Sequence, residues 1–195
     1  MSGVGAMVRL AVTLVVASLT WIAAAFTTAL AQDGDPPASI YHLEVALTDQ
    51  AGRTHGLDLY RGHPVLVTLF YGSCQATCPL IIETLRDIER QLPADRRAKL
   101  RVLLVSIDPQ NDTPAALRKL AGERRIDTSR WTLARADAAD VRRLAAVLDV
   151  QYRQLPGGGF YHSTMISLLT PQGEIAASST KLGRADENLL EALNR

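Results

Sequence analysis

The stretch that decides the fold is FYGSCQATCP, residues 70–79, which holds both cysteines of the chain. It follows an apolar run that predicts a buried strand, and it precedes residues 80–92, whose apolar side chains recur at helical spacing. Pro79 suits the first position of that helix, where a missing N–H costs nothing. Residues before a proline avoid helical angles, so we expect Cys78 at the cap and Cys74 in the loop before it.

A strand-to-helix junction gives these two thiols a distinct chemistry. The positive end of the helix dipole favours the thiolate, the form that attacks disulfides and binds soft metals. The alternative is a pair of buried structural cysteines or a static disulfide. The position argues against it, because loops at strand ends are where α/β proteins place their chemistry. With three residues between them, the sulfurs can bond each other or share one ion.

The composition is that of an ordinary globular protein with one core. The chain has 195 residues, 47% of them hydrophobic, and a formal net charge of +1. This near-neutral balance gives no reason to expect nucleic acid as a partner.

The N-terminus has the features of a targeting segment. Arg9 supplies a positive flank, residues 10–26 are apolar and uncharged, and residues 29–31 (Ala-Leu-Ala) have the small-x-small form of a cleavage site. The alternative is an uncleaved membrane anchor, since about 17–20 apolar residues can span a bilayer. Both interpretations place the rest of the chain outside the cytoplasm, where disulfides can form.

We therefore divide the chain into three parts. Residues 1–31 are predicted to be a signal peptide or an uncleaved anchor, residues 32–40 a linker with two adjacent prolines, and residues 41–195 one exported, periplasmic domain.

Strand and helix patterns alternate through that domain. A hairpin is expected over residues 43–59, then strands at 65–71, 100–107 and 131–134, interleaved with helices at 80–92, 114–124 and from Asp137 onward. A loop over 152–161, a hairpin over 165–179 and a helix over 185–193 follow. This order predicts a central sheet with helices on both faces. A strand, a thiol loop and a helix, followed by a final hairpin and helix, make the thioredoxin arrangement. The predicted class is thus α/β, a thioredoxin-like fold with an additional N-terminal β-hairpin and a helical insertion.

From about Leu43 to its end, the chain resembles the SCO/SenC family, named for synthesis of cytochrome c oxidase. The resemblance rests on several short segments in the right order: residues 47–52, 61–66, 74–80, 105–109, 112–114 and 162–163. In that family, a Cys-x-x-x-Cys motif and a distant histidine bind copper, and these match Cys74, Cys78 and His162. Family members deliver copper to the dinuclear copper site of cytochrome oxidase, or reduce the thiols of that site.

The resemblance implies an exported copper-binding metallochaperone whose client is a cytochrome oxidase subunit or a related cuproprotein. The sequence departs from the common family pattern at two places. Gln75 to Thr77 stand where family members usually carry Pro-Asp, and Tyr161 stands where many carry Asp before the histidine. The ligands are therefore kept, but the acidic residues around them are not.

The donor chemistry of the matched residues also suits copper. Two thiolates and an imidazole suit Cu(I) in a trigonal site and can also hold Cu(II). A structural zinc site would want four protein ligands, and no third cysteine exists to complete one. Considered alone, His162 would be a surface or capping histidine, and it is the family match that makes it a ligand. We interpret His42, His55 and His63 as surface residues.

A metal-free thiol–disulfide oxidoreductase using Cys74 and Cys78 as its redox pair is the alternative function, and it alone would make the protein an enzyme. The spacing between the cysteines is one residue longer than in the thioredoxin motif, which weakens that interpretation. In either case we expect a reversible disulfide in the apo protein, because the compartment is oxidising and the loop is short. We also expect the glycine-containing loop over residues 152–161 to be mobile without copper.

Overall fold

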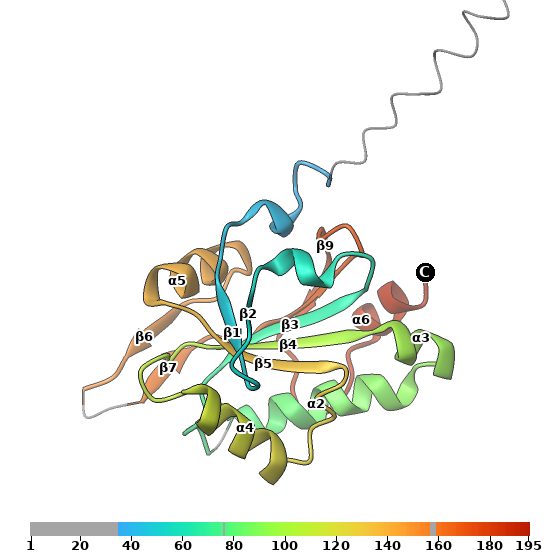
Figure 1. Cartoon of the computed structure of the whole chain (residues 1–195). Coiled ribbons are helices and arrows are strands. Elements are labelled where there is room, and N and C mark those ends of the chain that lie inside the picture. Colours follow the sequence, from blue (N-terminus) through green and yellow to red (C-terminus); the bar gives the residue numbers. More distant parts are fainter. Residues whose placement is uncertain (1–34, 76, 157–158) are drawn as a thin grey trace, which may run out of the picture. The chain divides into compact units, whose positions relative to one another are not determined.

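The computed structural model describes residues 35–75, 77–156 and 159–195 (Figure 1). The predicted signal peptide lies outside the described residues. Within those residues, no helix is both long enough and apolar enough to cross a membrane. Ser39 and Ile40 are buried, and the Ser39 hydroxyl donates to the Gln172 carbonyl at 2.6 Å. The packed region thus begins slightly before residue 41.

A seven-stranded sheet forms the centre of the domain, in the order β2-β1-β5-β4-β3-β8-β9. Its strands are β1 (Leu47–Asp49), β2 (Thr54–His55), β3 (Val65–Phe70), β4 (Arg101–Ser106), β5 (Trp131–Arg135), β8 (Ile166–Leu169) and β9 (Ile175–Ser179). The central strands β3, β4 and β5 run parallel, while β1 and β8 pair antiparallel on either side of them. The carboxyl ends of β3 and β4 therefore meet at one edge of the sheet, and the segments that follow them lie close together there.

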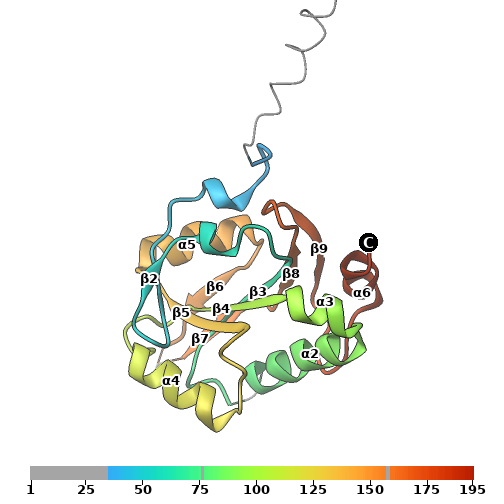
Figure 2. The ribbon, with the colours of Figure 1, turned by 45° about the vertical axis from the view of Figure 1, so that its right-hand side comes forward.

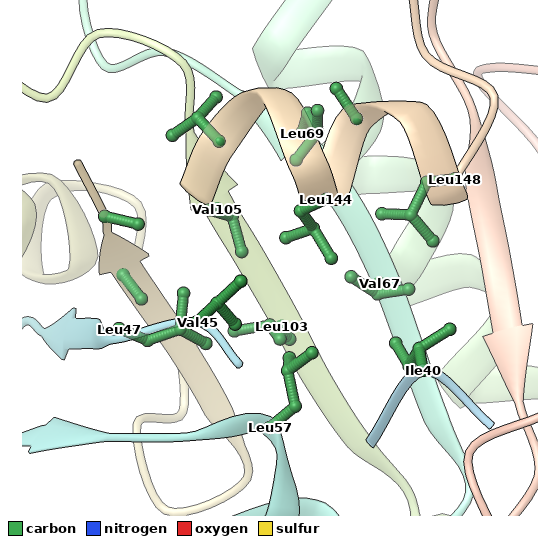
Figure 3. Packing of buried hydrophobic residues seen from close by; sticks show 14 of the residues in the cluster. Ile40, Val45, Leu47, Leu57, Val67, Leu69, Leu103, Val105, Leu144 and Leu148 are labelled. Atoms are coloured by element: carbon green, nitrogen blue, oxygen red, sulfur yellow. The ribbon is translucent and has the colours of Figure 1, made fainter. Parts of the chain in front are cut away.

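Helices cover both faces of this sheet, as the sequence predicts (Figures 1 and 2). They are the 3₁₀ helices η1 (Ile40–His42) and η2 (Leu57–Tyr60) and the α-helices α2 (Thr77–Gln91), α3 (Ala94–Lys99), α4 (Pro114–Glu123), α5 (Ala138–Val147) and α6 (Glu187–Leu193). On one face, Leu144 and Leu148 of the α5 region pack over β3 and β4 (Figure 3). On the other face, buried residues of α2, α4 and α6 form a second cluster with the sheet. Each face of the sheet thus has its own apolar core.

Two local expectations are wrong, and one helix was not expected. The segment predicted as a loop over residues 152–161 contains a second, two-stranded sheet, β6 (Tyr152–Gln154) and β7 (Phe160–His162). Tyr152 and Phe160 face the core and Arg153 does not, so this segment has the period of a strand. Gly157 and Gly158 lie outside the described residues, and the predicted mobility of this segment stays a prediction. Residues 57–60 form the helix η2 instead of a returning strand, and α3 was not predicted.

Candidate metal centre

Both cysteines lie at the junction of β3 and α2. The helix begins at Thr77, so Cys78 lies in its first turn and not at the cap. The Cys78 amide donates to the sulfur of Cys74 at 3.4 Å. The first N–H groups of a helix have no partner within the helix, and here a sulfur supplies one. The expectation that Cys78 lies at the cap, which rested on Pro79, is therefore wrong, and the sulfur contact stabilises the first turn instead.

Cys78 is buried, which contradicts the expectation of an accessible thiolate. Burial is the main cause that raises the pKa of its thiol from 9.0 to about 12, and the neighbouring Cys74 thiol adds to the shift. The Cys78 thiol donates to the Tyr71 carbonyl at 3.3 Å. Desolvation therefore outweighs the helix dipole at this position. Cys78 holds a proton at neutral pH, and a metal ion must displace that proton to bind.

The two cysteines are thiols here and not a disulfide. Cys74 is half-buried, and its side chain lies within hydrogen-bonding reach of Cys78. The structure therefore brings two of the three predicted ligands together.

His162, the third predicted ligand, is the last residue of β7 and is half-buried. Its Nδ1 lies 3.2 Å from the Ser163 carbonyl oxygen. Because a carbonyl oxygen can only accept, Nδ1 carries the hydrogen and Nε2 presents its lone pair. Burial also lowers the pKa of the imidazole. The ring is therefore held neutral with Nε2 available as a ligand atom.

Tyr71 connects His162 to the thiols. Its ring lies edge-on to the imidazole, with 5.9 Å between ring centroids. Its hydroxyl interacts with Cys74 and donates to the Phe160 carbonyl at 3.4 Å. Among the described residues, no three His, Cys, Asp or Glu side chains converge closely enough to hold a metal ion. His162 thus reaches the thiols through Tyr71 in this structure, and the three predicted ligands do not meet at one point.

A buried carboxylate that the sequence analysis did not single out also reaches the thiol loop. Asp112 accepts from the Gly72 amide at 2.9 Å and from the Ser106 hydroxyl. The neighbouring Asp108 is engaged elsewhere, since both of its carboxylate oxygens accept from the Asn111 side chain. Asp108 therefore orders its own turn, and Asp112 is the acidic residue that touches the loop carrying the cysteines.

The other three histidines lie in N-terminal elements away from this junction. His42 is exposed, as predicted, whereas His55 and His63 are half-buried. The His55 ring packs on Tyr60 with centroids 5.7 Å apart, and His63 Nδ1 lies 3.1 Å from the Lys99 carbonyl oxygen. These contacts give His55 and His63 structural roles.

Comparison with known proteins identifies relatives of this chain. The sequence profile of the SCO1/SenC family matches residues 35–195, a span that includes both thiols and His162. An SCO1 protein homologue of Bacillus subtilis is 26% identical over 83 residues, which cover 43% of this chain and 42% of that protein. The matched segment thus spans less than half of that relative.

Solved structures share the fold. A SCO1/SenC family lipoprotein of Bacillus anthracis superposes with a TM-score of 0.70 at 19% identity, covering 78% of this chain and 93% of that one. A structure of Bradyrhizobium japonicum ScoI with copper bound superposes with a TM-score of 0.65 at 22% identity, covering 77% of this chain and 96% of that one. These matches confirm the predicted α/β, thioredoxin-like fold.

Proposed function

The chain belongs to the SCO1/SenC family, and from that premise we propose that it is an exported metallochaperone carrying copper on Cys74, Cys78 and His162. The observation that carries the proposal is the pair of thiols held within reach of each other at the start of α2. Thiolates are soft ligands, which favour Cu(I) over the harder divalent ions. The copper is cargo for a client, a cytochrome oxidase subunit or a related cuproprotein.

The protonation states of His162 and Cys78 suit the loading and release of copper. The neutral His162 needs no deprotonation, because burial keeps its pKa low. Cys78 must lose a proton when copper enters, because burial raises its pKa to about 12. Copper binding is thus coupled to proton release, and protonation of Cys78 favours transfer to a client.

A Cu(I) competition experiment tests the binding. The protein is reduced, freed of metal and titrated with Cu(I) in the presence of bicinchoninate. One tightly held ion per chain is expected for the wild type, and none for the Cys74→Ser, Cys78→Ser double variant. His42→Ala, at an exposed histidine away from the junction, is the matched control and should bind like the wild type. Full affinity in the double variant would contradict the site.

Delivery and location need separate measurements. Copper-loaded protein mixed with the apo copper-binding domain of an oxidase subunit should pass its ion to that domain. Fractionation of cells should place the protein outside the cytoplasm, because residues 10–26 are apolar and uncharged. Recovery of the protein in the cytoplasm would contradict export.

A metal-free thiol–disulfide oxidoreductase remains the second candidate, and the contact between the two thiols favours it. The two functions separate in an insulin reduction assay with metal-free protein. A metallochaperone should show turnover near the uncatalysed rate, because the buried Cys78 thiol, whose pKa is raised, is scarcely ionised at neutral pH. Rapid turnover that depends on Cys74 and Cys78 would favour the enzyme.

A further inference from the structure

The amide that links Tyr71 to Gly72 connects both cysteines to a buried carboxylate. Its carbonyl accepts from the Cys74 amide at 3.2 Å and from the Cys78 thiol at 3.3 Å. Its N–H, which belongs to Gly72, donates to Asp112 Oδ2 at 2.9 Å. The N–H and C=O of a trans amide point in opposite directions within one rigid plane. Whatever fixes this N–H therefore also fixes the carbonyl that both cysteines contact.

The Asp112 carboxylate is held in place by a residue of the central sheet and not by the thiol loop. Asp112 is 5% exposed and Ser106, the last residue of β4, is 0% exposed. The Ser106 hydroxyl donates to the same oxygen, Oδ2, that the Gly72 amide contacts. The Ser106 hydroxyl in turn accepts from the Asp108 amide at 2.9 Å. This chain of hydrogen bonds anchors the thiol loop to the neighbouring parallel strand.

The contact leaves no space between loop and carboxylate. A Cβ atom at Gly72 would lie 2.4 Å from Asp112 Oδ1, closer than real Cβ atoms approach an oxygen. Gly72 has an ordinary negative φ, since it is not among the glycines of positive φ. The absence of a side chain here therefore serves the close approach to Asp112 and not a left-handed turn.

We propose that Asp112 is a positioning residue for copper exchange, which acts on the cysteines through the Tyr71–Gly72 amide. This inference rests on the proposed function. Once copper has displaced the Cys78 proton, the carbonyl keeps the Cys74 amide as its donor from the thiol loop. Without the carboxylate, the amide turns more freely and its carbonyl holds the Cys74 end of that loop less firmly. Preorganised ligands release a metal slowly, so loosening them speeds release.

Two substitutions of Asp112 separate its role as a hydrogen-bond acceptor from its charge. Asp112→Ala removes the acceptor, and we expect Cu(I) to leave about tenfold faster, at the low end of what losing an outer-shell partner costs. Asp112→Asn keeps a carbonyl oxygen for Gly72 and should restore release to within about threefold of the wild type. Release is timed by transfer of Cu(I) to excess bathocuproine disulfonate.

Asp186→Ala is the matched control. Asp186 is also 5% exposed, and it likewise accepts from a serine hydroxyl, at 2.6 Å, and from a backbone amide, at 3.0 Å. Those bonds hold the start of α6, so this variant should lose comparable stability in denaturant and still release copper at the wild-type rate. Equal acceleration by Asp186→Ala and Asp112→Ala would reduce the role of Asp112 to stability and overturn the proposal.

A metal-free measurement makes the inference independent of the proposed function. Amide hydrogen exchange at Gly72 and Cys74 should speed up in Asp112→Ala and not in Asp186→Ala. Unchanged exchange at both amides overturns the positioning role even if the wild type binds no copper. Should Asp112→Ala fail to fold, Ser106→Ala keeps the carboxylate but removes its anchor. Copper release about threefold faster then supports the proposal, and the wild-type rate overturns it.

Discussion

The β3–α2 junction and the β6–β7 hairpin contribute to the same candidate site but are built differently. At the junction, Cys78 packs into the core cluster beneath α2, and Asp112 ties the loop to β4. The hairpin is a separate two-stranded sheet. Its Tyr152 and Phe160 are only partly buried against the core, and its Tyr161 is exposed. The fold therefore holds the two cysteines that we propose as ligands at a packed junction, and it carries the proposed third ligand on a lightly attached element.

From this difference we infer that the junction and the hairpin have different roles in copper binding. A two-stranded hairpin has little stability of its own, and the contacts of Phe160 with Tyr71 and Tyr152, at centroid distances of 5.5 and 6.5 Å, help to hold it. Moving His162 toward the thiols costs less than rearranging the junction, which would disturb the core. In the proposed site, the histidine is then the ligand that we expect to join last and leave first.

The largest expected effect comes from the junction. Cys74→Ser or Cys78→Ser should each lower Cu(I) affinity more than about 100-fold, beyond what the loss of an outer-shell partner costs, because a hydroxyl is a poor ligand for Cu(I). Competition with bicinchoninate measures this. A loss below tenfold for either variant would show that the junction is not the principal binding element.

Slow modification of Cys78 is the next effect in size. Its pKa is about 12, against 9.0 for an ordinary thiol, so at pH 8 about 1000-fold less of it is thiolate. A thiolate of higher pKa is more nucleophilic, which offsets part of this difference. Alkylation of Cys78 should therefore be roughly 30- to 100-fold slower in the folded protein than in the unfolded chain. Iodoacetamide with mass spectrometry measures the rate, and the same protein in guanidinium is the control. Alkylation at the unfolded rate would contradict the burial of this thiol.

The same shift fixes the sign of a stability change. Because the pKa of Cys78 is higher in the folded protein, the folded thiol keeps its proton where the unfolded thiol has lost it. The reduced protein should therefore lose stability as pH rises from about 9 to about 12. Tyr41 and Tyr60 also have pKa values raised to about 12. Only the part of the stability loss that is absent in the Cys78→Ser variant is therefore due to the thiol.

Removing the hairpin ligand should have a smaller effect. His162→Ala is expected to weaken Cu(I) binding about tenfold, because two thiolates still hold the ion, and to weaken Cu(II) binding more, because Cu(II) favours nitrogen ligands. His63→Ala serves as the control. A loss as large as that of the cysteine variants would mean that both elements hold the ion equally, which would remove the difference drawn between them.

The smallest expected effect is at the connection between the two elements. Tyr71→Phe keeps the ring contacts but loses the hydroxyl, which interacts with Cys74 and donates to the Phe160 carbonyl. Loss of one or two such bonds should change the rate of Cu(I) loading by about two- to fivefold. Stopped-flow mixing with Cu(I) measures this rate. An unchanged rate would mean that Tyr71 does not control access of His162 to the thiols.

The sequence was sufficient for the architecture because strand and helix periods are local. The burial of Cys78 also has a local signal in the sequence: Ile81, Ile82 and Leu85 follow it at helical spacing and share its core cluster. The β6–β7 hairpin was missed because each strand has only three residues, too few for alternation to stand out beside a glycine run.

The roles of Asp112 and Tyr71 could not be predicted in the same way. The bond between Asp112 and Gly72 joins positions 40 residues apart, and it exists because β3 and β4 are adjacent and parallel. The contact of Tyr71 with His162 depends on where the hairpin folds back. Such contacts are consequences of tertiary packing, and no local pattern encodes them.

X-ray absorption at the copper edge of the Cu(I)-loaded protein tests the central claim most directly, because it counts the atoms bound to the metal. The claim is that Cys74 and Cys78 hold the ion and that His162 completes the site. The account predicts two sulfur ligands and one nitrogen in the wild type, and two sulfurs without that nitrogen in His162→Ala. A wild-type spectrum without sulfur, or one that His162→Ala leaves unchanged, would contradict it.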